Sequence, residues 1–138
     1  MIFLVVLACV IGLCVALVIG VAKNPGPSPA EIALGYEHAW DLGDFDVIYR
    51  MSGAELHDGM RKADYVAAKR SAYRGEVRVH GALEEAVAEE AHEQKDEAVV
   101  LTRLRRADGT VVHHEVRLAR RARVWEVVGY RLRPAPAH

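Results

Sequence analysis

The feature that most constrains this chain is a long N-terminal stretch without charge. Residues 1–22, MIFLVVLACVIGLCVALVIGVA, contain no Asp, Glu, Lys or Arg, and the first charged side chain is Lys23. An α-helix needs about 20 apolar residues to cross the hydrocarbon core of a bilayer. The sequence therefore predicts a transmembrane anchor over 1–22 in a single-pass membrane protein. Lys23 alone gives a weak preference for a cytoplasmic domain, and the side of the membrane stays open.

A cleaved signal peptide is the alternative interpretation of this stretch. Gly20-Val21-Ala22 fits a small-x-small cleavage site, but no basic residue precedes the apolar run, and the run exceeds the usual 7–15 residues of a signal core. A lipoprotein signal ending at Cys9 has only eight residues before the cysteine. Length and flanks favour an anchor that is kept.

Small residues recur at every fourth position of this stretch, at Ala8, Gly12, Ala16 and Gly20. Such spacing places them on one helix face, where they let two membrane helices approach closely. The pattern predicts a homodimer through the anchor. The two cysteines both lie in this stretch, so the rest of the chain has no disulfide and no thiolate metal site.

The remaining chain divides by composition. Residues 23–28 read KNPGPS and predict a short, Pro-rich linker. Residues 29–133 are enough for one domain with a modest core, and 134–138 form an unstructured tail. The net charge of −1 gives no basic field for nucleic acid.

The first half of the domain carries helix signals. Ser28-Pro29-Ala30-Glu31 is a capping box with proline at the first helical position, and Gly43 ends that helix. Asp44 caps a short second helix, and a further capping box at 52–55 opens another turn. A last helix is predicted over 62–74, with Gly75 after it.

The second half carries strand signals. Segments 99–104 and 111–118 flank Ala107-Asp108-Gly109-Thr110, and Asp-Gly favours a hairpin. A second turn at 120–123 leads to a last strand at 124–132. Segment 83–93 has helix-favouring composition but also alternates, and we interpret it as a strand. Helices followed by an antiparallel meander predict an α+β fold, with helices packed on one face of a curved sheet.

At this point the chain resembles the nuclear transport factor 2-like (cystatin-like cone) superfamily, especially small membrane-anchored actinobacterial members. The resemblance lies in EIALGYEHAWDLGDFDVIYRM at 31–51, AKRSAYRG at 68–75, RRADGTVVHHEVRL at 105–118 and WEVVGYRL at 125–132. It implies a cone-shaped domain whose cavity holds a small apolar ligand. The candidates to line that cavity are Tyr36, Trp40, Tyr49, Tyr65, His114, Trp125 and Tyr130.

Two functions from different classes fit these residues. The first is a membrane-anchored binding or protein-interaction module, which is favoured because the strands carry no inward Asp that could act as a catalytic base. We expect no cofactor, and no metal, because the histidines lack metal-ligand spacing. The second is an isomerase- or dehydratase-type enzyme that uses His114 with a tyrosine such as Tyr36. A filled, apolar cone would favour the module. A partly polar cavity that reaches His114 would favour the enzyme.

Overall fold

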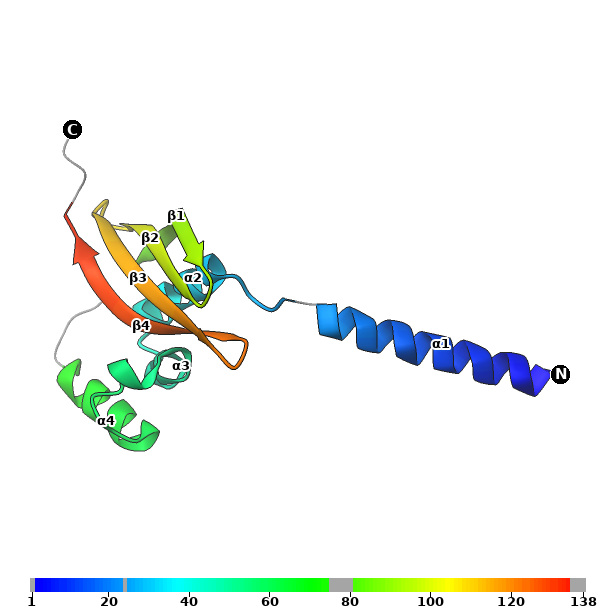
Figure 1. Ribbon diagram of the computed structural model, residues 1–138. Helices are drawn as coiled ribbons and strands as arrows, with labels where there is room; N and C mark the ends of the chain where they lie inside the picture. Colours follow the sequence, from blue (N-terminus) through cyan, green and yellow to red (C-terminus); the bar gives the residue numbers. More distant parts are fainter. Residues whose placement is uncertain (1, 24, 75–80, 135–138) are drawn as a thin grey trace.

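The computed structural model describes residues 2–23, 25–74 and 81–134 (Figure 1). Its helices and strands have the following bounds: α1 Ile2–Lys23, α2 Pro29–Leu42, α3 Phe45–Met51, the 3₁₀ helix η1 Ala54–Leu56, α4 Lys62–Ala72, β1 Leu83–Gln94, β2 Glu97–Arg106, β3 Val111–Arg121 and β4 Val124–Arg133. The four strands form one antiparallel sheet in the order β1-β2-β3-β4. The α+β architecture is thus as predicted.

The predicted membrane span is the part of the fold that needs correction. Within the described residues, no helix has both the length and the apolar character that crossing a membrane requires. The predictions of a transmembrane anchor over 1–22 and of a single-pass membrane protein are corrected accordingly to an N-terminal α-helix.

Helix α1 extends away from the rest of the molecule (Figure 1). Its described side chains, residues 5–20, are all exposed. A Cβ added at Gly12 or Gly20 would meet no described atom within 4 Å. Self-association through Ala8, Gly12, Ala16 and Gly20 therefore stays a prediction.

Helix α2 begins and ends where its capping residues indicate. The Ser28 hydroxyl accepts from Glu31 N at 3.3 Å, and Glu31 Oε2 accepts from Ser28 N at 2.7 Å. Gly43 takes the left-handed conformation, φ 65°, that commonly ends a helix. This confirms the predicted capping box and the predicted end of the helix.

The next predicted capping box, at 52–55, does not form. The Ser52 hydroxyl instead donates to Ile48 O at 2.6 Å, and η1 begins at Ala54, with Gly53 as its N-cap and no side-chain cap. The Glu55 carboxylate pairs with Arg121 on β3, and this hydrogen bond lowers the pKa of Glu55 to about 2. A distant arginine has therefore outcompeted the local backbone donor. The helix predicted over 62–74 ends at Ala72, and Gly75 lies outside the described residues.

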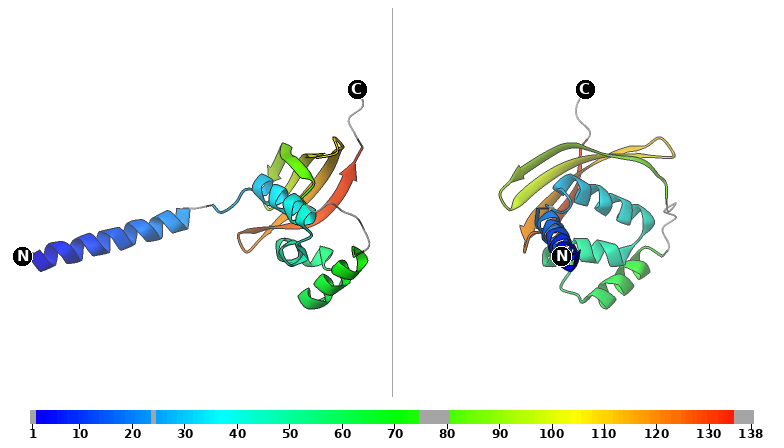
Figure 2. Two further views of the ribbon diagram at one scale, coloured as in Figure 1. Left: turned by 180° about the vertical axis from the view of Figure 1, so that it is seen from behind. Right: turned by 90° about the vertical axis from the view of Figure 1, so that its right-hand side faces the viewer.

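The sheet curves over α2, which lies against its concave face (Figure 2). Register shifts between Ala88 and Glu90 in β1 and between Arg117 and Leu118 in β3 mark bulges, which increase local bending. Segment 83–93, whose composition also favoured helix, is part of strand β1, as predicted.

The alternation of side chains along each strand determines which of them point into the core between the sheet and the helices. In β2 the inward, buried side chains are Ala98, Val100, Thr102 and Leu104, and in β3 His114, Val116 and Leu118 are buried beside them. The core between sheet and helices is completed by Ala33, Tyr36, Ala39, Phe45, Ile48, Tyr65, Trp125 and Val127. On the opposite face, Arg103 and Arg105 pair with glutamates of β1. Inward polar groups are therefore few, and Thr102 and His114 are two of them.

Candidate functional site

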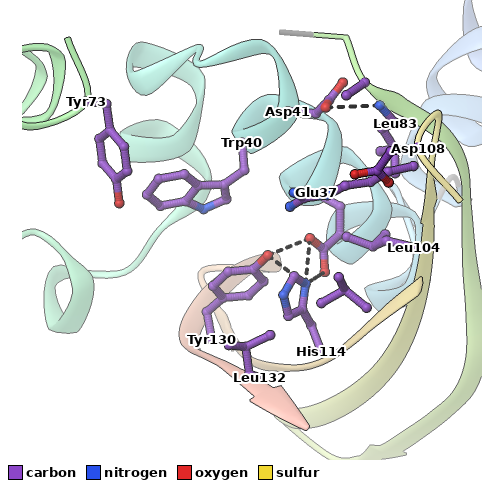
Figure 3. Close-up of a pocket in the computed structure, with 13 residues that line it drawn as sticks. Glu37, Trp40, Asp41, Tyr73, Leu83, Leu104, Asp108, His114, Tyr130 and Leu132 are labelled. Atoms are coloured by element: carbon purple, nitrogen blue, oxygen red, sulfur yellow. Dashed lines mark hydrogen bonds and ion pairs between the residues drawn. The ribbon is translucent and has the colours of Figure 1, made fainter. Parts of the chain in front are cut away.

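A cavity of about 540 Å³ opens between α2 and the concave face of the sheet (Figure 3). This lies within the roughly 300–1,000 Å³ typical of small-molecule sites. Its wall combines aliphatic, aromatic and polar side chains. The lining residues are Glu37, Trp40, Asp41, Tyr73, Ala82, Leu83, Leu104, Arg106, Asp108, Val112, His114, Tyr130 and Leu132.

A buried carboxylate, Glu37 of α2, lies at the inner end of the cavity. Only 1% of its side chain is exposed. The Thr102 hydroxyl donates to Oε1 at 2.7 Å, and the Tyr130 hydroxyl donates to Oε2 at 2.6 Å. His114 Nδ1 lies 2.9 Å from Oε1 and 3.1 Å from Oε2. A buried carboxylate is costly unless it is paired and hydrogen-bonded, and here three residues from three strands supply that compensation.

The orientation of the His114 ring follows from this carboxylate. An ionised carboxylate only accepts hydrogen bonds, so the Nδ1 facing Glu37 carries hydrogen. In the neutral ring the lone pair then lies on Nε2. Within the described part of the chain Nε2 has no hydrogen-bond partner, and it is not among the buried unpaired atoms. The imidazole therefore presents an acceptor nitrogen to the cavity that it lines.

Tyr130 of β4 joins this cluster to an aromatic wall. Its hydroxyl lies 2.8 Å from His114 Nδ1, and its ring lies parallel to Trp40 with centroids 6.3 Å apart. Trp40 in turn packs edge-on against Tyr73, with centroids 5.9 Å apart. Three aromatic side chains from α2, β4 and the end of α4 thus surround one part of the cavity (Figure 3).

The other part of the cavity wall carries three charged residues. Asp41 Oδ1 accepts from Leu83 N at 3.2 Å, which attaches the start of β1 to α2. Asp108, in the β2–β3 turn, accepts from the Thr110 hydroxyl and backbone N–H, and these bonds lower its pKa. Arg106 lines the same wall. Both carboxylates thus have backbone partners that hold the wall in place.

The structure brings together only some of the predicted cavity residues. Trp40, His114 and Tyr130 line the cavity. Tyr36, the tyrosine predicted to partner His114, does not line it. It is buried beside Trp40 and Tyr130, and burial raises the pKa of its hydroxyl. Tyr130 occupies the position next to the imidazole instead.

The other three predicted residues lie elsewhere in the domain. Tyr49 stacks on His57 with ring centroids 3.7 Å apart. Tyr65 is buried in the core, and burial raises its pKa to about 12. Trp125 is buried, with the Arg120 guanidinium 5.2 Å from its ring centroid. These aromatics pack the fold rather than line the cavity.

Glu37 and Thr102 are the residues that sequence reasoning missed. A charged residue in a helix is usually exposed, and Glu37 was not considered as a site residue. Yet Glu37 follows Ala33 by four positions and precedes Trp40 by three, so it lies on the same helix face as these apolar residues. That position was the available signal. Within the described residues, no group of three or more His, Cys, Asp or Glu side chains is placed to hold a metal ion.

Comparisons with known proteins bear on the fold alone. No family model matches the chain, and no curated protein matches it. A solved structure is similar to it: the solution structure of a SEC-C motif containing protein from Rhodopseudomonas palustris. The TM-score is 0.52 at 18% sequence identity, covering 75% of this chain and 77% of that one. This neighbour is described by its SEC-C motif and not by the superfamily name that the sequence resemblance suggested.

Proposed function

We propose that this protein binds a small molecule in the cavity and that His114 transfers a proton on it, as in isomerase- or dehydratase-type reactions. The observation that carries the proposal is the imidazole whose Nδ1 is held by Glu37 while Nε2 is left without a partner at the cavity. A general base needs a fixed orientation and an accessible lone pair. His114 has both.

The chemistry follows from the hydrogen-bond pattern. Nε2 would take a proton from a carbon next to a carbonyl, which leaves an enolate on the ligand and an imidazolium on the protein. The Glu37 carboxylate stabilises that imidazolium through Nδ1, as carboxylates do for catalytic histidines. If the imidazolium first exchanges its Nε2 proton with solvent, delivery of the solvent proton to the same carbon gives hydrogen exchange, and delivery of a proton to another carbon gives isomerisation. Neither outcome needs an oxidant or a cofactor.

The interaction-module hypothesis is supported less well by this geometry. It would expect a filled, apolar cone, whereas the cavity is hollow and reaches three hydrogen-bonded polar groups. Ligand binding without turnover remains the second candidate, because the same hydrogen bonds also satisfy a buried carboxylate. The two candidates differ in whether His114 is needed for turnover.

The test is proton exchange on small cyclic ketones. The full chain would be incubated with a panel of such ketones in D₂O, and loss of the α-proton signals would be followed by NMR. We expect the wild-type protein to accelerate exchange for at least one ketone and His114→Gln to reduce that acceleration by 10²-fold or more, the usual range for general-base catalysis.

A matched control lies next to His114 in the chain. His113 is the preceding residue of β3, and its side chain points to the other face of the sheet. His113→Gln should therefore leave exchange unchanged. If His114→Gln folds and exchanges ketone protons as fast as the wild type, proton transfer by His114 is refuted. If wild-type protein binds ketones but exchanges nothing, the chain is a binding module.

A further inference from the structure

Two carboxylates face the cavity from one helix, those of Glu37 and Asp41 in α2. They are four positions apart, so they lie one turn from each other on the same helix face, where like charges repel. Trp40 lines the cavity beside them. Helix α2 therefore presents two negative charges and an aromatic side chain to the occupant of the cavity.

Neither carboxylate is paired with a lysine or an arginine of the described residues. Glu37 accepts from two hydroxyls and from the His114 imidazole, which is neutral when it acts as a base. Asp41 Oδ1 accepts from the Leu83 backbone N–H, and no hydrogen bond of the described residues reaches Oδ2. These hydrogen bonds satisfy oxygen atoms but leave two negative charges without a positive partner.

The other two charged residues of the cavity wall, Asp108 and Arg106, lie near each other. Hydrogen bonds from Thr110 lower the pKa of Asp108, and the positive charge of Arg106 adds to that shift. Both residues are exposed, at the end of β2 and in the turn after it, so solvent and salt screen them. Their charges largely offset each other. The excess negative charge of the wall therefore lies on α2.

Aromatic rings supply a second attraction for positive charge. Figure 3 shows Asp41 and Asp108 on one side of Glu37 and the rings of Trp40 and Tyr130 on the other. A cation is attracted to the face of an aromatic ring, more strongly where water is excluded. A cleft with one sign of charge and low-dielectric walls also raises the local concentration of counter-ions. The acids and the rings thus favour the same kind of ligand.

The unpartnered atoms of the inner cavity also point to a donor. His114 is only 8% exposed, and its Nε2 has no partner among the described residues. Asp41 Oδ2 is likewise an acceptor without a donor among them. An ammonium group brings only donors, whereas a carboxylate brings only acceptors. An amine therefore complements these atoms and an acid does not.

We infer that the cavity binds a small organic cation, a protonated amine with an apolar body, and that Asp41 determines this specificity. The inference rests on the proposed function, because it uses the same cavity, and it adds the charge class of the ligand. The ammonium group donates to Asp41 Oδ2, and Glu37 adds negative potential from the interior. The substrate of the proposed proton transfer is then an amine that also carries a carbonyl group.

Three probes that share a benzene ring and one substituent carbon test the charge preference. At neutral pH benzylamine is a cation, benzyl alcohol is uncharged and benzoate is an anion. Each would be titrated into the ¹⁵N-labelled full chain, and dissociation constants would be taken from the N–H signals of cavity residues. We expect benzylamine to bind at least about tenfold more tightly than either other probe, the value of one hydrogen bond to a charged group. Tightest binding of benzoate, equal binding of all three, or no binding of benzylamine overturns the inference.

Asp41→Asn tests the residue itself. Asparagine keeps an oxygen that accepts from the Leu83 N–H but removes the negative charge. Benzylamine should then bind at least about tenfold more weakly, while benzyl alcohol should change by less than about twofold. Unchanged benzyl alcohol binding shows that the cavity is intact. The preference among the three probes is measured on the wild type, so it decides the inference even if this variant does not fold.

Asp44→Asn is the matched control. Asp44 caps α3 outside the cavity lining, and asparagine caps a helix about as well as aspartate. The control removes the same charge and should leave benzylamine binding within about twofold. An equal loss in both variants, or no loss in Asp41→Asn, refutes the role of Asp41.

The two proposals fail separately. A preference for benzylamine without any proton exchange on ketones refutes only proton transfer by His114. Proton exchange without a preference for benzylamine refutes only the cationic class of the ligand.

Discussion

At the scale of single residues, the site depends on how one buried carboxylate is satisfied. Glu37 accepts from a hydroxyl on β2, an imidazole on β3 and a phenol on β4. Only the last two line the cavity, whereas Thr102 is fully buried behind them. Thr102 therefore serves the site only through Glu37.

This arrangement makes Thr102→Val an informative substitution. Valine has nearly the same shape but removes the donor to Glu37 Oε1, so we expect a loss of about 1–3 kcal/mol in the free energy of unfolding. Urea denaturation measures the change. Thr102→Ser keeps the hydroxyl and should cost less than the valine variant. A valine variant as stable as the wild type would mean that this hydrogen bond contributes nothing.

At the scale of elements, the β3–β4 connection carries backbone strain. Ala122 and Arg123 form a two-residue turn with φ of 48° and 66°. Tight hairpins of this kind require positive φ at both positions, and glycine or asparagine is preferred there. For residues other than glycine, this left-handed conformation costs free energy.

We expect Arg123→Gly to stabilise the protein. Relief of the left-handed strain, reduced by the greater freedom of glycine in the unfolded chain, should give a net gain of about 0.5–1 kcal/mol. The gain would appear as a melting temperature a few degrees higher in a thermal scan. Arg123→Ala removes the charge but keeps the strain, so it should leave stability nearly unchanged. An equal gain in both variants would assign the effect to charge.

The sequence predicted elements whose signals are local. Ser28 and Gly43 delimit α2, and the alternation of β3 places His114 on the covered face, because caps and strand periodicity need only neighbouring residues. The capping box predicted at 52–55 does not form because the Glu55 carboxylate accepts from Arg121, 66 positions along the chain, instead of from the backbone of Ser52. Capping patterns read from neighbouring residues cannot predict a contact with a residue so far along the chain.

The site was predictable only in part, for the same reason. Trp40, His114 and Tyr130 were candidates because aromatic and imidazole side chains on inward positions line cavities. Glu37 was missed because its three donors come from strands far along the chain, and without them a glutamate in a helix is expected in solvent. To predict that Glu37 is buried, one would have to know how the helix α2 packs against the strands β2, β3 and β4.

At the scale of the whole molecule, the core is built without α1. No described residue of α1 belongs to the hydrophobic core cluster, and its described side chains are exposed. Stability therefore comes from the contact between the helices α2 to α4 and the sheet.

Deletion of residues 1–24 should consequently leave the melting temperature within about 2 °C, the shift expected from less than about 0.5 kcal/mol. Full-length and shortened chains would be compared in the same mild detergent, because an exposed apolar helix favours aggregation. A fall of 5 °C or more would show that α1 packs on the domain in solution.

The separation in sequence of the Glu37 partners has a consequence for folding. His114 and Tyr130 lie 77 and 93 positions from Glu37. Contacts over such distances form slowly, because long loops must close first. A partly folded chain with β4 undocked would be compact but lack the pocket, so a ligand would bind only the complete fold. By mass action, a ligand at 100 times its dissociation constant would then add about 2.7 kcal/mol to stability. Heat resistance of the chain in the presence of candidate compounds would thus report occupancy of the site without any assay of turnover.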